Sequence, residues 1–132
     1  MGKAYMANFY VTREYIRKHR DTYFVFGDNI LGIGYGGQAR ECRGEPNTIG
    51  IPTKWSPSMK PQAFFRDADF YKVKPYIDEA FRKMIDVLEQ GYDVCFLPNI
   101  GRGLAKLHIT APVIMDYINN WIQEILREYG KV

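Results

Sequence analysis

Helical periodicity on both sides of one short apolar run limits the fold of this chain more than any other feature. Apolar residues recur at three- and four-residue spacing over residues 74–90 and again over residues 110–130, which predicts two amphipathic helices. Between them, residues 94–97 are all apolar and are followed by Pro98, the pattern of a strand buried on both faces. A buried strand between two helices indicates a parallel sheet and an α/β fold.

The ends of these two helices carry residues with known positional preferences. Pro75 suits the first turn of the first helix, and Gly91 suits the position just after its last turn. Thr110 is the expected cap of the second helix, and Gly130 is its expected stop. We therefore expect the helix boundaries to lie close to these four residues.

The N-terminal half contains two further apolar runs, residues 23–26 and 48–51, each followed at once by Gly, Asp or Pro. Both runs predict inner strands. Thr12 is expected to cap a short helix that extends through Lys18, and residues 4–10 are a weaker strand candidate. The prediction is a sheet of about four or more strands.

Length and charge limit the domain count and the class of partner. The 132 residues are 46% hydrophobic, which fits one domain covering residues 1–132. The net charge of +3 results from 18 Lys and Arg against 15 Asp and Glu. This balance is too even for binding that depends mainly on counterion release, so it disfavours nucleic acid as a partner.

Cysteine and histidine are scarce and widely spaced. Cys42 and Cys95 lie far apart without C-x-x-C spacing, and His19 and His108 are the two histidines. We therefore expect no disulfide framework, no zinc site and no other metal or cofactor. No stretch approaches the ~18 apolar residues that span a bilayer, so a membrane is not an expected partner. Reduced thiols and the polar N-terminus predict a cytoplasmic protein, and the oligomeric state stays open.

The first glycine loop, residues 27–40, follows the predicted strand that ends at Phe26. In an open parallel sheet, ligands bind at the carboxyl ends of the strands, so this loop is a candidate site. Glycines allow close backbone approach, and the N-terminus of a following helix offers free N–H groups, which together form a phosphate cradle. Its candidate ligand-binding residues are Gly27, Asp28, Asn29, Gly32, Gly34, Gly36, Gly37 and Gln38.

Two other interpretations of this loop stay open. The spacing Gly32-x-Gly34-x-x-Gly37 matches the dinucleotide-binding fingerprint. However, that fingerprint needs glycines at the strand end and an acid about 20 residues later, and residues 52–54 are Pro-Thr-Lys. A Rossmann oxidoreductase is therefore disfavoured, whereas a glycine-rich surface turn without a ligand remains an alternative.

The second glycine loop, residues 98–107, follows the strand predicted at residues 94–97. Because the carboxyl ends of parallel strands share one edge of the sheet, the two glycine loops should face each other. The backbone of the two loops and the guanidinium of Arg102 could neutralise the charge of a diphosphate without a metal. The candidate binding residues of this loop are Pro98, Asn99, Gly101, Arg102, Gly103 and Leu104.

The proline loop, residues 52–61, contains Lys54 and Trp55. A lysine at a strand end beside a phosphate cradle could pair with an anion or, once desolvated, act as a nucleophile. Trp55, Tyr35, Phe64 and Phe65 could stack on an adenine, although aromatic residues more often belong to a core. Lys54 is the first candidate catalytic residue.

Together these segments resemble the macro domain superfamily, α/β modules that bind ADP-ribose. Residues 24–28, Phe-Val-Phe-Gly-Asp, are similar to the strand and aspartate of that family, whose carboxylate takes the adenine amino group. Residues 32–39 resemble its first phosphate-binding loop. Residues 97–107, LPNIGRGLAKL, resemble the P-x-I-G-x-G-L-x-x-L second loop. The resemblance implies a compact three-layer fold with a mostly parallel central sheet.

The second loop is most similar to the branch that removes ADP-ribose from carboxylate esters. In that branch a lysine after a strand ending in Ile and Thr is the attacking group, and residues 51–54 place Lys54 there. The branch then has an aspartate after the second-loop leucine, where this chain has His108 after Leu107. His108 is therefore the second candidate catalytic residue, and the change favours binding over hydrolysis.

Four functions follow from these residues. The leading hypothesis is binding of ADP-ribose or a related adenine-diphosphate-ribose nucleotide between the two glycine loops. The first alternative is an ADP-ribosyl-ester hydrolase that uses Lys54. The second alternative is a phage or mobile-element protein that sequesters a cyclic ADP-ribose-type immune signal. An RNA-binding module that uses the basic and aromatic loops is the weakest, because the net charge is small.

Overall fold

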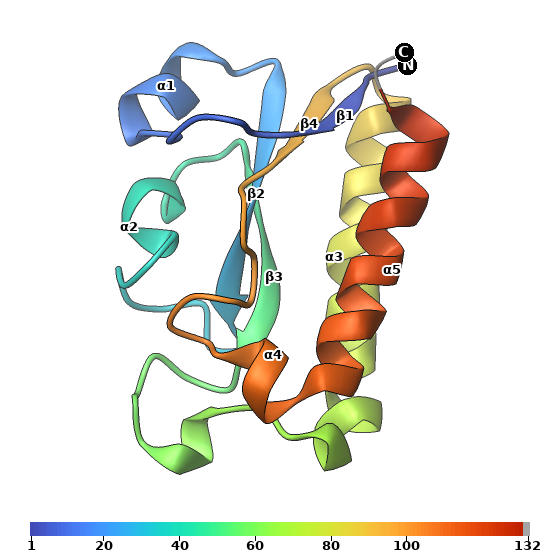
Figure 1. The fold of residues 1–132 in the computed structure, drawn as a ribbon. Coiled ribbons are helices and arrows are strands. Elements are labelled where there is room, and N and C mark those ends of the chain that lie inside the picture. The colour runs from blue at the N-terminus through green and yellow to red at the C-terminus, as the bar shows by residue number, and fades with distance from the viewer. Residues whose placement is uncertain (131–132) are drawn as a thin grey trace.

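A computed structural model describes residues 1–130, and in it two layers of helices enclose a central sheet (Figure 1). The strands are β1 (Ala4–Met6), β2 (Thr22–Asn29), β3 (Thr48–Lys54) and β4 (Asp93–Phe96). Their order is β1-β4-β2-β3, and each neighbouring pair is parallel. The predicted α/β class with a parallel sheet is therefore confirmed.

The helices divide between the two faces of the sheet. The long helices α3 (Phe70–Glu89) and α5 (Pro112–Tyr129) cover one face, and the short helices α1 (Arg13–Lys18) and α2 (Ala39–Cys42) cover the other (Figure 1). The remaining turns are η1 (Pro61–Ala63), η2 (Asp67–Asp69) and α4 (Leu107–Thr110). The three layers place both glycine loops at one end of the sheet.

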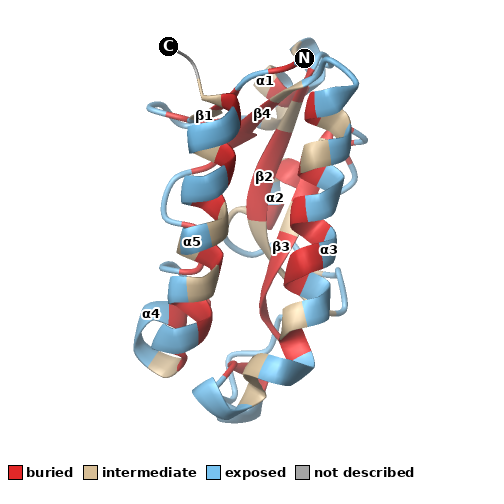
Figure 2. Ribbon diagram, turned by 90° about the vertical axis from the view of Figure 1, so that its right-hand side faces the viewer, coloured by how far each residue is buried: buried red, intermediate tan, exposed pale blue. Residues whose placement is uncertain are grey.

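Each face of the sheet has its own apolar core. Val25 contributes to the larger core under α3 and α5, whereas its neighbours Phe24 and Phe26 contribute to the smaller core under α1 and α2. This alternation follows from the two-residue period of a strand. The buried sides of α3 and α5 face the sheet (Figure 2), so the helical periodicity of the sequence marks the inner faces of these helices.

A buried carboxylate joins the two long helices. Asp78 of α3 accepts hydrogen bonds from Lys74 Nζ at 2.9 Å, from Trp121 Nε1 at 3.0 Å and from the Tyr117 hydroxyl. Burial alone would raise the pKa of Asp78, but these three donors outweigh it and hold the pKa below its ordinary value. Asp78 is therefore a charged group that stabilises the contact between α3 and α5 at neutral pH.

Replacing this carboxylate should destabilise the fold. In Asp78→Ala, the tyrosine and tryptophan donors lose their acceptor, so we expect the free energy of unfolding to fall by about 2 kcal/mol. Urea denaturation at pH 7 measures this loss, and Glu79→Ala, at an exposed neighbouring carboxylate, is the matched control. Equal stability of the two variants would contradict a stabilising role for Asp78.

The first long helix begins earlier than predicted. Pro75 lies inside α3 and not in its first turn, because η2 starts the helical path at Asp67. Asp69 fixes this start by accepting a hydrogen bond from the Arg66 backbone N–H at 2.8 Å. At the other end, Gly91 has φ +104° just after the helix, so its predicted role as the stop is confirmed.

The start of the second long helix also differs from the prediction. Thr110 is not its cap, because Thr110 ends α4 and α5 begins at Pro112. Proline suits this position, where its missing N–H would have no helical partner. Gly130 follows α5 as predicted, but with φ −62° it ends the helix without a left-handed turn. The prediction for α1 is confirmed, because Thr12 Oγ1 accepts from the Tyr15 N–H at 3.1 Å.

The two cysteines are buried in the smaller core and do not form a disulfide with each other. Burial raises the pKa of Cys42 to about 12, so its reactive thiolate form is scarce at neutral pH. Within residues 1–130, no three His, Cys, Asp or Glu side chains gather to hold a metal ion. None of the helices in this described part of the chain has the length and apolar character to cross a membrane.

Candidate functional site

The strands that support the site are longer than their apolar runs. β2 continues through Asn29 and β3 continues through Lys54, so the predicted ends at Phe26 and Ile51 are three residues too early. Asp28 pairs with Pro52 in parallel register, and the ladder is irregular at the following residue. The sheet therefore holds Asp28, Asn29 and Lys54 in place, which a mobile loop would not do.

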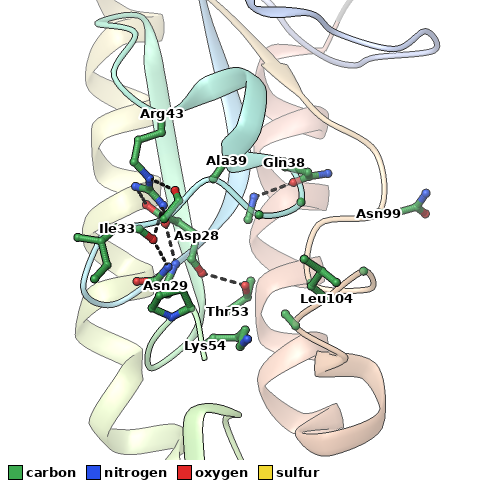
Figure 3. Close-up of a pocket in the computed structure, with 18 of the residues that line it drawn as sticks. Asp28, Asn29, Ile33, Gln38, Ala39, Arg43, Thr53, Lys54, Asn99 and Leu104 are labelled. Carbon is green, nitrogen blue, oxygen red and sulfur yellow. Dashed lines mark hydrogen bonds and ion pairs between the residues drawn. The ribbon is translucent and has the colours of Figure 1, made fainter. Parts of the chain in front are cut away.

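A cavity of about 300 Å³ opens at the carboxyl ends of β2, β3 and β4, between the two glycine loops (Figure 3). The predicted site residues that line it are Lys54, Gly27, Asp28, Asn29, Gly34, Gly36, Gly37, Gln38, Pro98, Asn99, Gly101, Gly103 and Leu104. The two loops, residues 27–40 and 98–107, are distant in the sequence but meet at one cavity, at the edge where a parallel sheet binds ligands.

Three predicted site residues lie elsewhere. Arg102 is exposed on the second glycine loop and does not line the cavity. His108 is exposed on α4, also outside the cavity lining. Gly32 lines a second hollow of about 270 Å³ between the first glycine loop, β3 and α3. The structure therefore does not bring His108 together with Lys54.

Arg43, which was not predicted, organises the first glycine loop. Its guanidinium forms a bidentate ion pair with Asp28, with N–O distances of 2.5 and 3.1 Å (Figure 3). Its Nε donates to the Gly34 carbonyl at 2.6 Å, and its Nη2 donates to the Ile33 carbonyl at 3.2 Å. Hydrogen bonding to Asp28 raises the pKa of Arg43, which stays charged. Arg43 thus ties the loop to the end of β2.

Gln38 connects the two glycine loops. Its Oε1 accepts from the Gly27 N–H at 2.7 Å, and its Nε2 donates to the Pro98 carbonyl at 2.6 Å. Leu104 adds an apolar contact, because a Cβ on Gly36 or Gly37 would lie 3.4 or 3.5 Å from its Cδ1. The cavity is therefore formed between two loops that already contact each other.

The second glycine loop contains left-handed backbone. Gly101 has φ +83°, and a Cβ there would lie 3.0 Å from Met115 Sδ and 3.1 Å from Leu107 Cδ2. Asn99 and Lys106 also have positive φ, which costs a residue with a side chain on the order of 1–3 kcal/mol. This conformation is maintained by the packing of the loop on α4 and α5, so its backbone is preorganised.

Lys54 is a buried cation in the cavity wall. Lys54 is only 7% exposed. Its Nζ donates a hydrogen bond to the Ser58 carbonyl at 2.6 Å and lies 4.6 Å from the centre of the Phe64 ring. No carboxylate of residues 1–130 lies within ion-pair distance of it. Burial lowers the pKa of Lys54 below the ordinary lysine value.

The aromatic candidates do not gather around the cavity. Phe65 is fully buried and packs edge-on against Trp55, so both are part of the core and its margin. Phe64 lies beneath Lys54, and Tyr35 is largely exposed on the first glycine loop. A stacking platform for a base is therefore absent from the cavity lining among the described residues.

Sequence reasoning missed Arg43 and Thr53. Thr53 is buried in the cavity floor, where its hydroxyl donates to the Asp28 carbonyl at 2.9 Å. Arg43 comes directly after the short helix α2 and lacks a local motif that would link it to Asp28, 15 positions earlier. The one sequence signal for this ion pair was an acidic residue at the end of a strand followed by a basic residue just after the next helix.

The lining combines three chemical elements. Backbone from glycine-rich turns can approach an anion closely, and an ion pair stands at the end of β2. One buried ammonium, that of Lys54, has no carboxylate to neutralise it. Such a lining can hold an anionic group beside Lys54 and a polar, hydrogen-bonding group beside Asp28.

Comparison with known proteins gives one match. Residues 6–121 match the model of a family described as "Family of unknown function (DUF7831)". No curated protein and no solved structure matches the chain. Because the matched residues cover most of the sequence, from β1 into α5, the chain belongs to the DUF7831 family.

Proposed function

We propose that the protein binds ADP-ribose or a related adenine-diphosphate-ribose nucleotide in the cavity between its glycine loops. The observation that carries this proposal is the convergence of the two loops, joined by Gln38, at the carboxyl ends of three parallel strands. The same loops carry the resemblance to macro domains.

The proposed ligand uses each chemical element of the cavity. The diphosphate lies against the backbone of the glycine loops, with the Lys54 ammonium as its cationic partner. The adenine lies at Asp28, the residue that matches the adenine-binding aspartate of macro domains. A single buried ammonium without a carboxylate favours an anionic ligand over a neutral nucleoside.

Titration calorimetry with a panel of nucleotides tests this proposal. The panel contains ADP-ribose, ADP-ribose 1″-phosphate, cyclic ADP-ribose isomers, NAD and a short RNA. We expect saturable binding of at least one ligand that contains both adenine and diphosphate, and no saturable binding of the RNA. Binding of RNA alone, or no binding at all, would overturn the proposal, and preference for a cyclic isomer would point to sequestration of a signal.

Ester hydrolysis is the second candidate function, and the environment of Lys54 favours it. A lysine acts as a nucleophile only when it loses its proton, and burial lowers the pKa of Lys54 in that direction. The exposed position of His108 argues against a role as the acid–base partner of Lys54. Binding with slow or no turnover therefore remains our leading proposal.

A further inference from the structure

The ion pair between Asp28 and Arg43 leaves a defined set of hydrogen-bonding groups unused. A guanidinium has five N–H groups. In Arg43, the Nε group donates to the Gly34 carbonyl, and the two Nη2 groups donate to Asp28 Oδ1 and to the Ile33 carbonyl. Its Nη1 donates once, to Asp28 Oδ2 at 3.1 Å. One N–H of Nη1 therefore has no acceptor among the described residues.

The carboxylate of Asp28 likewise has one hydrogen-bonding position that is not used. Asp28 Oδ1 accepts from Arg43 Nη2 at 2.5 Å and from the Asn29 backbone N–H at 2.8 Å. Asp28 Oδ2 accepts from Arg43 Nη1 alone. One unused acceptor position at Oδ2 therefore lies beside one unused donor at Nη1, on two side chains that are 14% and 15% exposed. Both side chains line the cavity, and these two atoms lie near Gly50 and Gly32, on the side where Asp28 also lines the second hollow.

We propose that Arg43 is a specificity-determining residue that, as a pair with Asp28, selects adenine over guanine. The pair offers one donor beside one acceptor, the same combination as the Asn or Gln amide that binds adenine through N6 and N7. Guanine presents two acceptors, O6 and N7, at the equivalent edge. The proposal rests on the proposed nucleotide function and adds to it the pair of residues that discriminates between the two purine bases.

The pair differs from an unpaired aspartate in what it rejects. A free carboxylate is acceptor-only and matches two adjacent donors, such as N1–H and the N2 amino group of guanine. Because Arg43 occupies part of Asp28, that arrangement is blocked in the native protein. Removing Arg43 should therefore weaken adenine binding and improve guanine binding at the same site.

The test compares the affinities of ADP-ribose and GDP-ribose by calorimetry for the wild type, Arg43→Met and Arg40→Met. We expect the wild type to prefer ADP-ribose by about 10- to 100-fold, and Arg43→Met to reduce that ratio at least about tenfold. Arg40→Met removes a neighbouring exposed arginine of α2 and should keep the wild-type ratio. If the substitution only disordered the loop, the affinities for both ligands would fall together and the ratio of the two affinities would stay unchanged.

The outcomes separate the two proposals. An unchanged ratio in an Arg43→Met protein that still binds ADP-ribose would overturn the role of Arg43 and leave the proposed function standing. No binding of either ligand by the wild type would overturn the proposed function itself. Should Arg43→Met fail to fold, Arg43→Lys keeps a cation but loses the bidentate geometry, and the same ratio decides the matter.

Discussion

Gly103→Val is expected to reduce binding of ADP-ribose below detection while the protein melts cooperatively near the wild-type temperature. Gly103 lines the cavity, and a Cβ at this position would meet no atom within 4 Å. The added Cβ therefore has open space in the protein, so we expect the fold to tolerate valine, whereas its branched carbons fill the space through which a phosphate must approach the backbone. Calorimetry measures the binding and thermal denaturation measures the fold.

Gly101→Val is the matched control for this prediction. Gly101 lies two residues earlier in the same loop, has φ +83° and faces Met115 and Leu107 at about 3 Å, so valine there should destabilise the fold itself. The contrast between the two glycines separates a binding surface from a structural turn. Full ADP-ribose affinity in a folded Gly103→Val protein would show that the ligand does not approach this loop.

Lys54→Met is expected to weaken ADP-ribose binding by about 10- to 100-fold. This is the loss of affinity that corresponds to the free energy of one hydrogen bond to a charged group. Methionine retains most of the volume of lysine and removes a buried charge, so the melting temperature should stay unchanged or rise. Lys60→Met, at an exposed lysine of the same proline loop, is the control and should bind normally. Equal binding by both variants would remove Lys54 from the site.

The pH dependence of binding provides an independent measurement on Lys54. Burial lowers its pKa in the free protein, and a bound diphosphate favours the protonated ammonium. Affinity should therefore be highest below the lowered pKa and fall as the pH rises through it, by no more than about tenfold per pH unit. Lys54→Met should lack this fall in affinity.

The same variant decides whether the protein is an enzyme. We expect wild type to release ADP-ribose from an ester-linked ADP-ribosylated peptide slowly or not at all, as followed by chromatography. Rapid release by wild type that is lost in Lys54→Met would establish the hydrolase and replace the binding proposal. In that case the acid–base group would have to be sought among the cavity residues, because His108 lies outside the lining.

The sequence predicted the long helices and the inner strands of the fold because their signals are local. The residues of α3 and α5 repeat every three or four positions, and the strands contain continuous apolar runs. It misplaced Pro75 and Thr110 because a proline can lie one turn inside a helix and a threonine can end one helix just before another. The ends of a helix depend on local contacts such as the hydrogen bond between Asp69 and Arg66, and the periodicity of apolar residues gives no information about such contacts.

The candidate site was predictable to the extent that strand ends converge in a parallel sheet. That rule brought the two glycine loops together around Lys54 and Asp28. It could not predict Arg43, whose partners are 9 to 15 positions away and depend on how the loop turns back. It also could not show that Arg102 and His108 lie outside the lining, because the path of the second glycine loop, which has positive φ at Asn99 and Lys106, is not visible in residue spacing.

The buried state of both cysteines makes the chain well suited to site-specific fluorescent labelling. Cys42 and Cys95 are shielded from alkylating reagents in the folded protein, and Cys42 has a pKa of about 12. A cysteine introduced at Leu104, which is 52% exposed where the two glycine loops touch, would therefore be the preferred target of a maleimide dye. The native thiols need not be removed first, and the dye would report directly on the mouth of the cavity.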